Sequence, residues 1–171
     1  AMLNLLPLTL LENWLPSWTA KTILTLGWVW FMNLYNFMDG IDGITSSESI
    51  SIAAGIILVM AFDNTFGEGL AYHAIIVVGA MSGFWWWNRH PAKIFLGDVG
   101  SVPIGFIMGY LLLMFAEKGY GYAAAILPAY YVMDASVTLA KRAPEKKKIW
   151  QAHREHFYQQ ATTHLERHDH V

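Results

Sequence analysis

The sequence predicts an all-α protein, a polytopic bundle of about five transmembrane helices joined by cytoplasmic loops. Three observations support this fold class. The 171-residue chain is 55% hydrophobic and only 14% charged, which is unusual for a soluble domain. Its apolar residues gather in long stretches that carry almost no charge. Its eight Trp, eight Tyr and nine Phe residues suit a chain that crosses membrane interfaces repeatedly.

Each of five apolar segments is expected to form one membrane helix, and they cover residues 22–38, 50–62, 70–87, 102–116 and 122–140. A straight crossing needs about 20 residues. The second and fourth segments are therefore complete only if residues 46–51 and 98–101 extend them, and a re-entrant segment is the alternative at either place. The links 63–69 and 117–121 are short, polar and contain glycine, which predicts turns between antiparallel helices.

Counting the crossings also predicts the orientation. Five crossings place Asp39, residues 88–101 and residues 141–171 on one side of the membrane. Nine of the eleven basic residues then share that side, which the positive-inside rule makes cytoplasmic. The nine are Arg89, Lys93, Lys141, Arg142, Lys146, Lys147, Lys148, Arg154 and Arg167, and only Lys21 and Lys118 fall on the opposite side.

The domain organisation is expected to be simple. We find no internal repeat and no linker, so residues 1–171 are taken as one membrane domain with a basic, histidine-containing cytoplasmic tail at 141–171. The chain starts with Ala1 and lacks the basic first region of a signal peptide, which suggests the C-terminal part of a longer protein. It contains no cysteine, which excludes disulfides and thiolate metal sites.

The first polar motif continues an apolar segment at residues 33–43. Asn33, Asn36 and Asp39 recur every three residues, so they share a face if the helix persists. An ionised group at membrane depth costs at least about 2.5 to 3.5 kcal/mol, and such groups usually line a cavity. Together with Asp42 they suit a divalent cation or the donor groups of a nucleobase. The alternative is that the carboxylates only end the helix at the interface.

The second motif is the loop at residues 88–101. Gly97 and Gly100 allow a tight turn or a close approach to a ligand around Asp98. Ser101 followed by Pro103 predicts a helix start, and a helix N-terminus favours a phosphate. Asp98 beside it could hold Mg²⁺, leaving positions for water and phosphate oxygens. In the alternative reading Asp98 only caps a turn.

The third motif lies in the tail. His153 and His156 are three residues apart and share a face of any helix there, while Arg154 suits bidentate contacts with phosphate oxygens. The pair alone is weak evidence for a metal, because a zinc site needs three or four ligands. Residues 146–148 are expected to be attracted to anionic membrane lipid in any case.

Together the three motifs resemble the polyprenyl-phosphate N-acetylhexosamine-1-phosphate transferases, and most closely the branch that initiates O-antigen. The matching stretches are Asn-x-x-Asn-Phe-Met-Asp-Gly-Ile-Asp-Gly at 33–43, Pro-Ala-Lys-Ile-Phe-Leu-Gly-Asp-Val-Gly-Ser at 91–101 and His-Arg-Glu-His-Phe-Tyr-Gln at 153–159. The resemblance covers nearly all of this chain but about the second half of a typical member. It implies transfer of a sugar 1-phosphate from a UDP-N-acetylhexosamine to undecaprenyl phosphate, with release of UMP, at a cytoplasmic magnesium site.

The resemblance also implies roles for individual residues. Asp98 corresponds to the principal Mg²⁺ ligand and Asn36 to a second ligand, with Mn²⁺ as the alternative ion. Asp39 and Asp98 are the expected catalytic residues. Phe95 is expected to stack on uracil, and the basic tail motif to close over the donor phosphates. The expected substrate-binding set is Asn33, Asp42, Asn88, Phe95, His153, Arg154 and His156.

The implied setting is the bacterial inner membrane, where the enzyme would initiate O-antigen or another cell-envelope polysaccharide. Membrane lipid is an expected partner, a homodimer is compatible with the sequence, and no nucleic-acid partner is expected. Family members carry an adjacent Asp-Asp pair in an earlier loop, and this chain has none. A truncated, noncatalytic relative that binds the UDP-sugar is therefore one alternative. A transporter or channel lined by the intramembrane Asn and Asp residues is the other.

Overall fold

The computed structural model describes residues 11, 14–66, 69–142 and 157 of the chain. Every regular element within these residues is helical, which confirms the all-α prediction. The elements are α2 (Ser17–Met38), α3 (Ile44–Phe62), α4 (Gly69–Asn88), α5 (Gly97–Phe115), the π-helical turn η2 (Ala116–Tyr120), α6 (Gly121–Ile126) and α7 (Ala129–Arg142).

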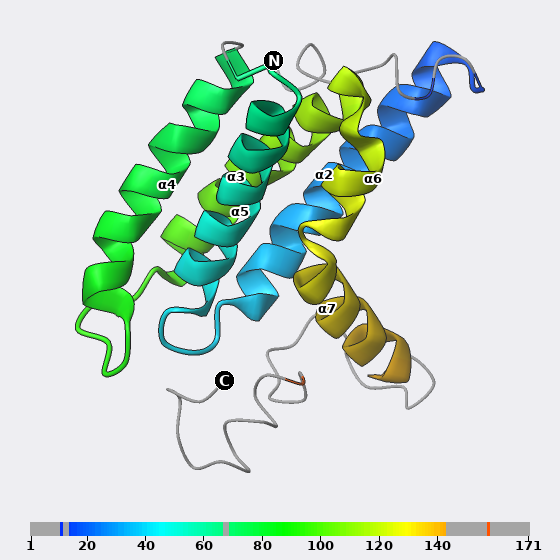
Figure 1. Ribbon diagram of the computed structural model, residues 1–171. Coiled ribbons are helices and arrows are strands. Elements are labelled where there is room, and N and C mark those ends of the chain that lie inside the picture. Colours follow the sequence, from blue (N-terminus) through cyan, green and yellow to red (C-terminus); the bar gives the residue numbers. More distant parts are fainter. Residues whose placement is uncertain (1–10, 12–13, 67–68, 143–156, 158–171) are drawn as a thin grey trace.

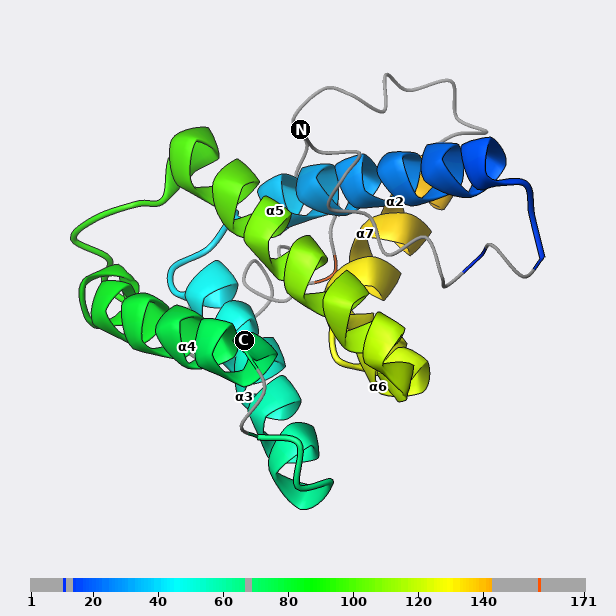
Figure 2. The same cartoon turned by 90° about the horizontal axis from the view of Figure 1, so that it is seen from above.

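The bundle is built around two antiparallel helix pairs, α2 with α5 and α3 with α4 (Figure 1 and Figure 2). Glycines one turn apart bring α2 and α5 close. A Cβ atom at Gly109 would lie 2.5 Å from Cδ1 of Trp28, and one at Gly105 would lie 2.8 Å from Cβ of Tyr35. Small residues at this spacing are typical of helices that pack tightly in membranes. The indole Nε1 of Trp28 also donates a 3.0 Å hydrogen bond to the Phe106 carbonyl.

Two buried tyrosines connect α2, α3 and α7. The rings of Tyr35 and Tyr131 are fully buried, with centroids 5.0 Å apart. The Tyr35 hydroxyl shares a 3.2 Å hydrogen bond with Ser49, and the Tyr131 hydroxyl shares one of 3.2 Å with Thr45. Because a buried hydroxyl without a partner is costly, these pairings fix α7 against the start of α3.

Three parts of the described chain are long and apolar enough to cross a membrane, namely Ile44–Phe62, Gly69–Asn88 and Gly97–Ile126. The last of these comprises α5, η2 and α6. Residues 46–51 and 98–101 do extend the second and fourth predicted segments, because α3 and α5 begin before them. Helix α2 has 22 residues but is less apolar, since Lys21, Asn33 and Asn36 lie in it. The described residues thus contain three candidate spans where five were predicted.

The prediction of one continuous fifth helix at 122–140 is wrong. Helix α6 ends at Ile126 and α7 begins at Ala129, with Pro128 between them. Proline has no backbone N–H to continue a helix, and its ring clashes with the preceding turn. The link at 117–121 is a bend as predicted but forms a π-helical turn, in which Gly119 has a φ of 98° that other residues rarely adopt.

The connecting loops divide the bundle into two ends. Residues 39–43 and 89–96 lie at one end, which we call the site end (Figure 1). Residues 63–66 and η2 lie at the opposite end, which we call the far end. Arg89 and Lys93 are at the site end, whereas Lys21 and Lys118 are at the far end. This agrees with the predicted separation of basic residues for those whose side chains are described.

Candidate active site

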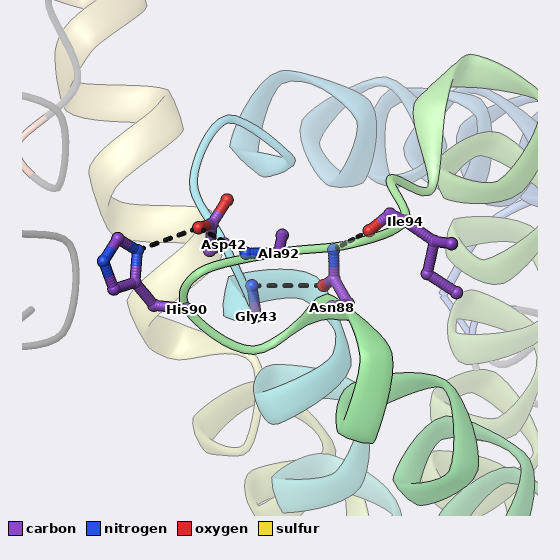
Figure 3. Close-up of polar contacts among 6 residues, drawn as sticks. All are labelled: Asp42, Gly43, Asn88, His90, Ala92 and Ile94. Atoms are coloured by element: carbon purple, nitrogen blue, oxygen red, sulfur yellow. Dashed lines mark hydrogen bonds and ion pairs between the residues drawn. The ribbon is translucent and has the colours of Figure 1, made fainter.

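Asn88 joins the loops of the site end through three hydrogen bonds, of which those to Gly43 and Ile94 are drawn in Figure 3. Its Oδ1 accepts from the backbone N–H of Gly43 at 3.1 Å and from the Ser46 hydroxyl at 3.3 Å. Its Nδ2 donates to the Ile94 carbonyl at 2.9 Å. Gly43 suits this contact, because its φ is 78° and a Cβ atom there would lie only 3.4 Å from Trp85. The buried Asn88 amide therefore holds α3, α4 and the 89–96 loop together.

Asp42 secures the same loop from the other side (Figure 3). Its Oδ2 accepts a hydrogen bond from the backbone N–H of Ala92 at 3.1 Å, and it lies 3.0 Å from Nδ1 of His90. The carboxylate is largely buried against the loop. The sequence predicted Asp42 and Asn88 as nucleotide contacts, and the structure brings them together as neighbours that fix the loop.

The first and second motifs meet where α2 packs on α5. The Ser101 hydroxyl donates to Oδ1 of Asn36 at 2.5 Å and also lies 3.0 Å from the Gly97 carbonyl. The prediction that Ser101 caps the helix is wrong, because α5 begins four residues earlier at Gly97. Pro103 consequently lies inside α5 rather than in its first turn. The contact places the Asn36 amide next to the first turns of α5.

Asp39 and Asp98 are the two acidic side chains beside this contact. Helix α2 ends at Met38, so Asp39 caps the helix rather than continuing its face as predicted. Burial raises the pKa of Asp39, a hydrogen bond with Thr45 lowers it, and the nearby charge of Asp98 raises it again. Asp98 is exposed in the first turn of α5, where the helix dipole favours a negative charge. A cation between two carboxylates placed in this way would relieve their repulsion.

The oxygen donors at this position fit magnesium better than a zinc-like ion. Mg²⁺ is usually held by one or two carboxylates, with waters and substrate phosphates completing its coordination. Asp98, Asp39 and the Asn36 amide supply oxygen donors of this kind. No group of three or more His, Cys, Asp and Glu side chains able to hold a metal is present among the described residues.

Two further predicted residues are exposed. The Phe95 ring is 74% exposed on the loop that Asn88 and Asp42 fix. Asn33 is also exposed, and its Nδ2 donates to the Val29 carbonyl of its own helix at 2.9 Å. The remaining predicted residues, His153, Arg154 and His156, lie outside the residues that the structure describes.

Two acidic residues of the helices, Asp134 and Glu48, were not among the predicted site residues. Asp134 is buried in α7, where its Oδ1 accepts from the Thr138 hydroxyl at 3.2 Å and from the backbone N–H of Phe157 at 3.0 Å. Phe157 is the one residue of the 153–159 motif that the structure describes, and this bond joins its backbone to α7. Glu48 lies in α3, and its buried Oε1 has no hydrogen-bond partner in the described part of the chain. A charged residue inside an apolar helix was the signal that could have found both.

A comparison with protein families identifies the chain. The model of glycosyl transferase family 4 matches residues 2–116, which include the first two motifs. The chain belongs to this family. The matched residues include Asn36, Asp39 and Asp98.

Curated relatives of this family 4 chain agree with the assignment. A probable undecaprenyl-phosphate N-acetylglucosaminyl 1-phosphate transferase of Bacillus subtilis is 29% identical over 87% of this chain and 42% of its own length. A phospho-N-acetylmuramoyl-pentapeptide-transferase of Deinococcus radiodurans is 27% identical over 70% of this chain and 35% of its own. A phospho-N-acetylmuramoyl-pentapeptide-transferase of a Psychrobacter strain is 30% identical over 79% of this chain and 40% of its own length. The chain therefore spans less than half the length of these relatives.

Proposed function

We propose that this chain forms the nucleotide-sugar half of a phosphoglycosyl transferase active site. The complete enzyme would transfer N-acetylhexosamine 1-phosphate from a UDP-sugar to undecaprenyl phosphate and release UMP, as an early step of cell-envelope polysaccharide synthesis. The observation that carries this proposal is the pair Asp39 and Asp98 beside the Asn36 amide, at one end of an apolar bundle of glycosyl transferase family 4. The names of the Bacillus and Deinococcus relatives support the reaction class.

We assign Asp98 as the principal Mg²⁺ ligand and Asn36 as the second, with Mn²⁺ as the alternative ion. When bound there, the metal would neutralise the charge that develops on the donor pyrophosphate. Asp98 is exposed and free to meet a ligand, while the Ser101 hydroxyl orients the Asn36 oxygen. Asp39 is assigned as the further acidic group of the site.

In the proposed reaction an oxygen of undecaprenyl phosphate attacks the β-phosphorus of the UDP-sugar. A new P–O bond forms there, and the bond from the β-phosphorus to the bridging oxygen breaks, so that UMP leaves with that oxygen. Little covalent chemistry falls to the protein, and positioning with electrostatic stabilisation accounts for most of the rate.

The donor is positioned by the 89–96 loop and the tail motif. Phe95 is assigned to stack on uracil, because its exposed ring stands on a loop that Asn88 and Asp42 hold in place. Asn33 is assigned to the donor side of the site because of its exposure on α2. His153, Arg154 and His156 are assigned to the donor phosphates, because Arg suits bidentate contacts with phosphate oxygens.

The orientation and setting follow from the same proposal. Arg89 and Lys93 at the site end favour the cytoplasmic side of the inner membrane. The donor sugar is taken as an N-acetylhexosamine and the product as a precursor of O-antigen or a similar polymer.

Two measurements on two proteins test the proposal. The 171-residue chain and the product of the full-length gene are each titrated calorimetrically with UDP-N-acetylglucosamine, with Mg²⁺ and with EDTA. UMP release is then measured with undecaprenyl phosphate present. We expect both to bind the UDP-sugar only with Mg²⁺, and the full-length protein to release UMP. Binding without UMP release from either protein would favour a noncatalytic relative. Absence of Mg²⁺-dependent binding to both would overturn the proposal.

A further inference from the structure

The last turn of α4 and the first residues of the loop after it form a second feature of the site end, on side chains to which the proposed reaction assigns no role. Three consecutive tryptophans, Trp85, Trp86 and Trp87, precede Asn88 at the end of this candidate span. The Trp86 and Trp87 side chains are 61% and 50% exposed. Tryptophan settles at the boundary between hydrocarbon and headgroups, so this turn marks the membrane surface at the site end.

Two cationic side chains lie over these rings. The guanidinium carbon of Arg89 is 4.2 Å from the Trp86 ring centroid and 5.7 Å from that of Trp85. The Lys93 ammonium is 5.4 Å from the Trp87 ring centroid. All three distances fall within the range of about 6 Å for cation–π attraction. The rings therefore hold both charges at the membrane boundary before any ligand arrives.

The backbone fixes the same arrangement. The Arg89 N–H donates to the Trp85 carbonyl and the Lys93 N–H to the Trp87 carbonyl, each at 2.8 Å. The second of these bonds folds the loop back against the end of α4. The positions of the two charges consequently depend on the fold of the loop as well as on side-chain rotamers.

Neither charge is neutralised by a carboxylate. Among the described residues, Arg89 and Lys93 make no ion pair, and the nearby Asp42 is occupied by His90 and the Ala92 N–H. The two cations instead border a cavity of about 480 Å³. Its lining residues are Trp86, Trp87, Arg89, His90, Pro91 and Lys93.

We propose that this cavity binds the headgroup phosphate of an anionic phospholipid. The planar Arg89 guanidinium matches phosphate oxygens in a bidentate manner, and Lys93 adds a second charge. The exposed indoles of Trp86 and Trp87 would contact the glycerol and the upper acyl region. Basic residues near a membrane surface attract anionic lipid, and here two of them are fixed around one cavity. None of the six lining side chains has a role in the proposed reaction, so this inference does not depend on it.

The test measures lipid retention on the 171-residue chain by native mass spectrometry, with titration by phosphatidylglycerol or by neutral phosphatidylcholine. We expect the wild-type chain to retain phosphatidylglycerol preferentially, and the double variant Arg89→Gln with Lys93→Gln to bind it about tenfold more weakly. Lys21→Gln is the matched control, because it removes one charge at the far end. The affinity of Lys21→Gln for phosphatidylglycerol should equal that of the wild type, because Lys21 does not border the cavity. The basic tail is the same in every variant, so it does not contribute to differences between them.

Two further variants separate binding from folding. The exchange Arg89→Lys with Lys93→Arg keeps both charges and should keep most of the phosphatidylglycerol affinity. Lys93→Gln alone changes an exposed side chain and should weaken binding by about threefold, roughly half of the double effect on a logarithmic scale. Circular dichroism would show that each variant remains helical. Wild-type affinity for phosphatidylglycerol in both Lys93→Gln and the double variant Arg89→Gln with Lys93→Gln would overturn the proposal.

A competition experiment identifies the source of the phosphate. Phosphatidylglycerol should displace a labelled phosphatidylglycerol from the chain, whereas inorganic phosphate at the same concentration should not. Equal displacement by inorganic phosphate, or equal retention of phosphatidylcholine, would overturn the assignment to an anionic lipid headgroup.

Discussion

The two ends of the bundle treat their polar groups differently. At the far end the Tyr120 hydroxyl donates to the Asp63 carboxylate and shares a 3.2 Å hydrogen bond with Thr65. The Tyr120 ring also stacks on Phe115, with centroids 4.7 Å apart. The polar side chains that end α3 and η2 thus satisfy one another and leave the Asp63 carboxylate with a partner.

At the site end only some polar groups are satisfied internally. Asn88 and Asp42 are committed to hydrogen bonds that fix the loops. Asp98 makes no hydrogen bond or ion pair with any described residue, although it lies near the partly buried Asp39. Leaving two carboxylates close together is costly unless a cation joins them. Asp63 at the far end and Asp42 at the site end thus both stabilise the fold, whereas Asp98 at the site end has no partner among the described residues.

The largest expected effect is the loss of activity when a carboxylate is removed at the site end, and removing one at the far end is its control. In the full-length enzyme, Asp98→Asn should lower UMP release by about 100-fold, because it removes a group that holds charge at the reacting phosphates. Asp63→Asn removes a similar carboxylate at the far end and should change the rate by less than about twofold. UMP release by membranes measures both. An equal loss in the two variants would contradict the difference between the ends.

The next effect concerns the loop that carries Phe95. Asn88→Ala should destabilise the protein by about 3 kcal/mol, because it removes three hydrogen bonds and leaves the buried backbone N–H of Gly43 without that partner. The matched control is Asn33→Ala, which removes one exposed bond within a helix and should cost less than about 0.5 kcal/mol. Reversible unfolding in mixed detergent micelles gives both free energies. Similar values would show that Asn88 does not fix the site end.

A smaller effect is expected where α2 meets α5, since this contact sets Asn36 beside Ser101. Gly109→Ala should cost about 2 kcal/mol, because its Cβ would lie 2.5 Å from the Trp28 ring. Gly79→Ala adds the same atom on α4, where nothing lies within 4 Å, and should be neutral or slightly stabilising. Reversible unfolding in mixed detergent micelles measures both variants. An unchanged free energy of unfolding in Gly109→Ala would show that α2 and α5 can move apart without loss of stability.

The smallest effect belongs to the far end. Tyr120→Phe keeps the ring stacked on Phe115 but removes the hydroxyl that bonds Asp63 and Thr65. The expected loss of stability is about 1 kcal/mol. UDP-sugar binding, measured by calorimetry, should be unchanged. A clear loss of binding in a variant that stays folded would mean that the far end influences the site, and the comparison between the ends would need revision.

Sequence patterns identified the helical architecture well but not its breaks. The apolar runs located four of the helices, because an apolar chain in lipid satisfies its backbone groups most simply as helix. Pro128 lay inside the fifth run and was not read as a break, although proline ends helices. Ser101 was interpreted as a cap because Pro103 follows it, a local pattern typical of a helix start. Its hydroxyl instead bonds Asn36, a partner 65 positions away, and no local pattern could reveal it.

Within the site, the sequence by itself determined which residues are chemically suited to a cation and a nucleotide, because Asn and Asp side chains in apolar surroundings are costly and usually line a cavity or pathway. The tertiary structure decided how those residues divide. Asp42 and Asn88 became supports of a loop, since their partners at 90, 92 and 43 are far away in sequence. Asp39 is partly buried with a hydrogen bond to Thr45, whereas the nearby Asp98 is exposed. That division depends on the packing of α2 on α5 and of α3 on α4, and only the folded bundle establishes those contacts.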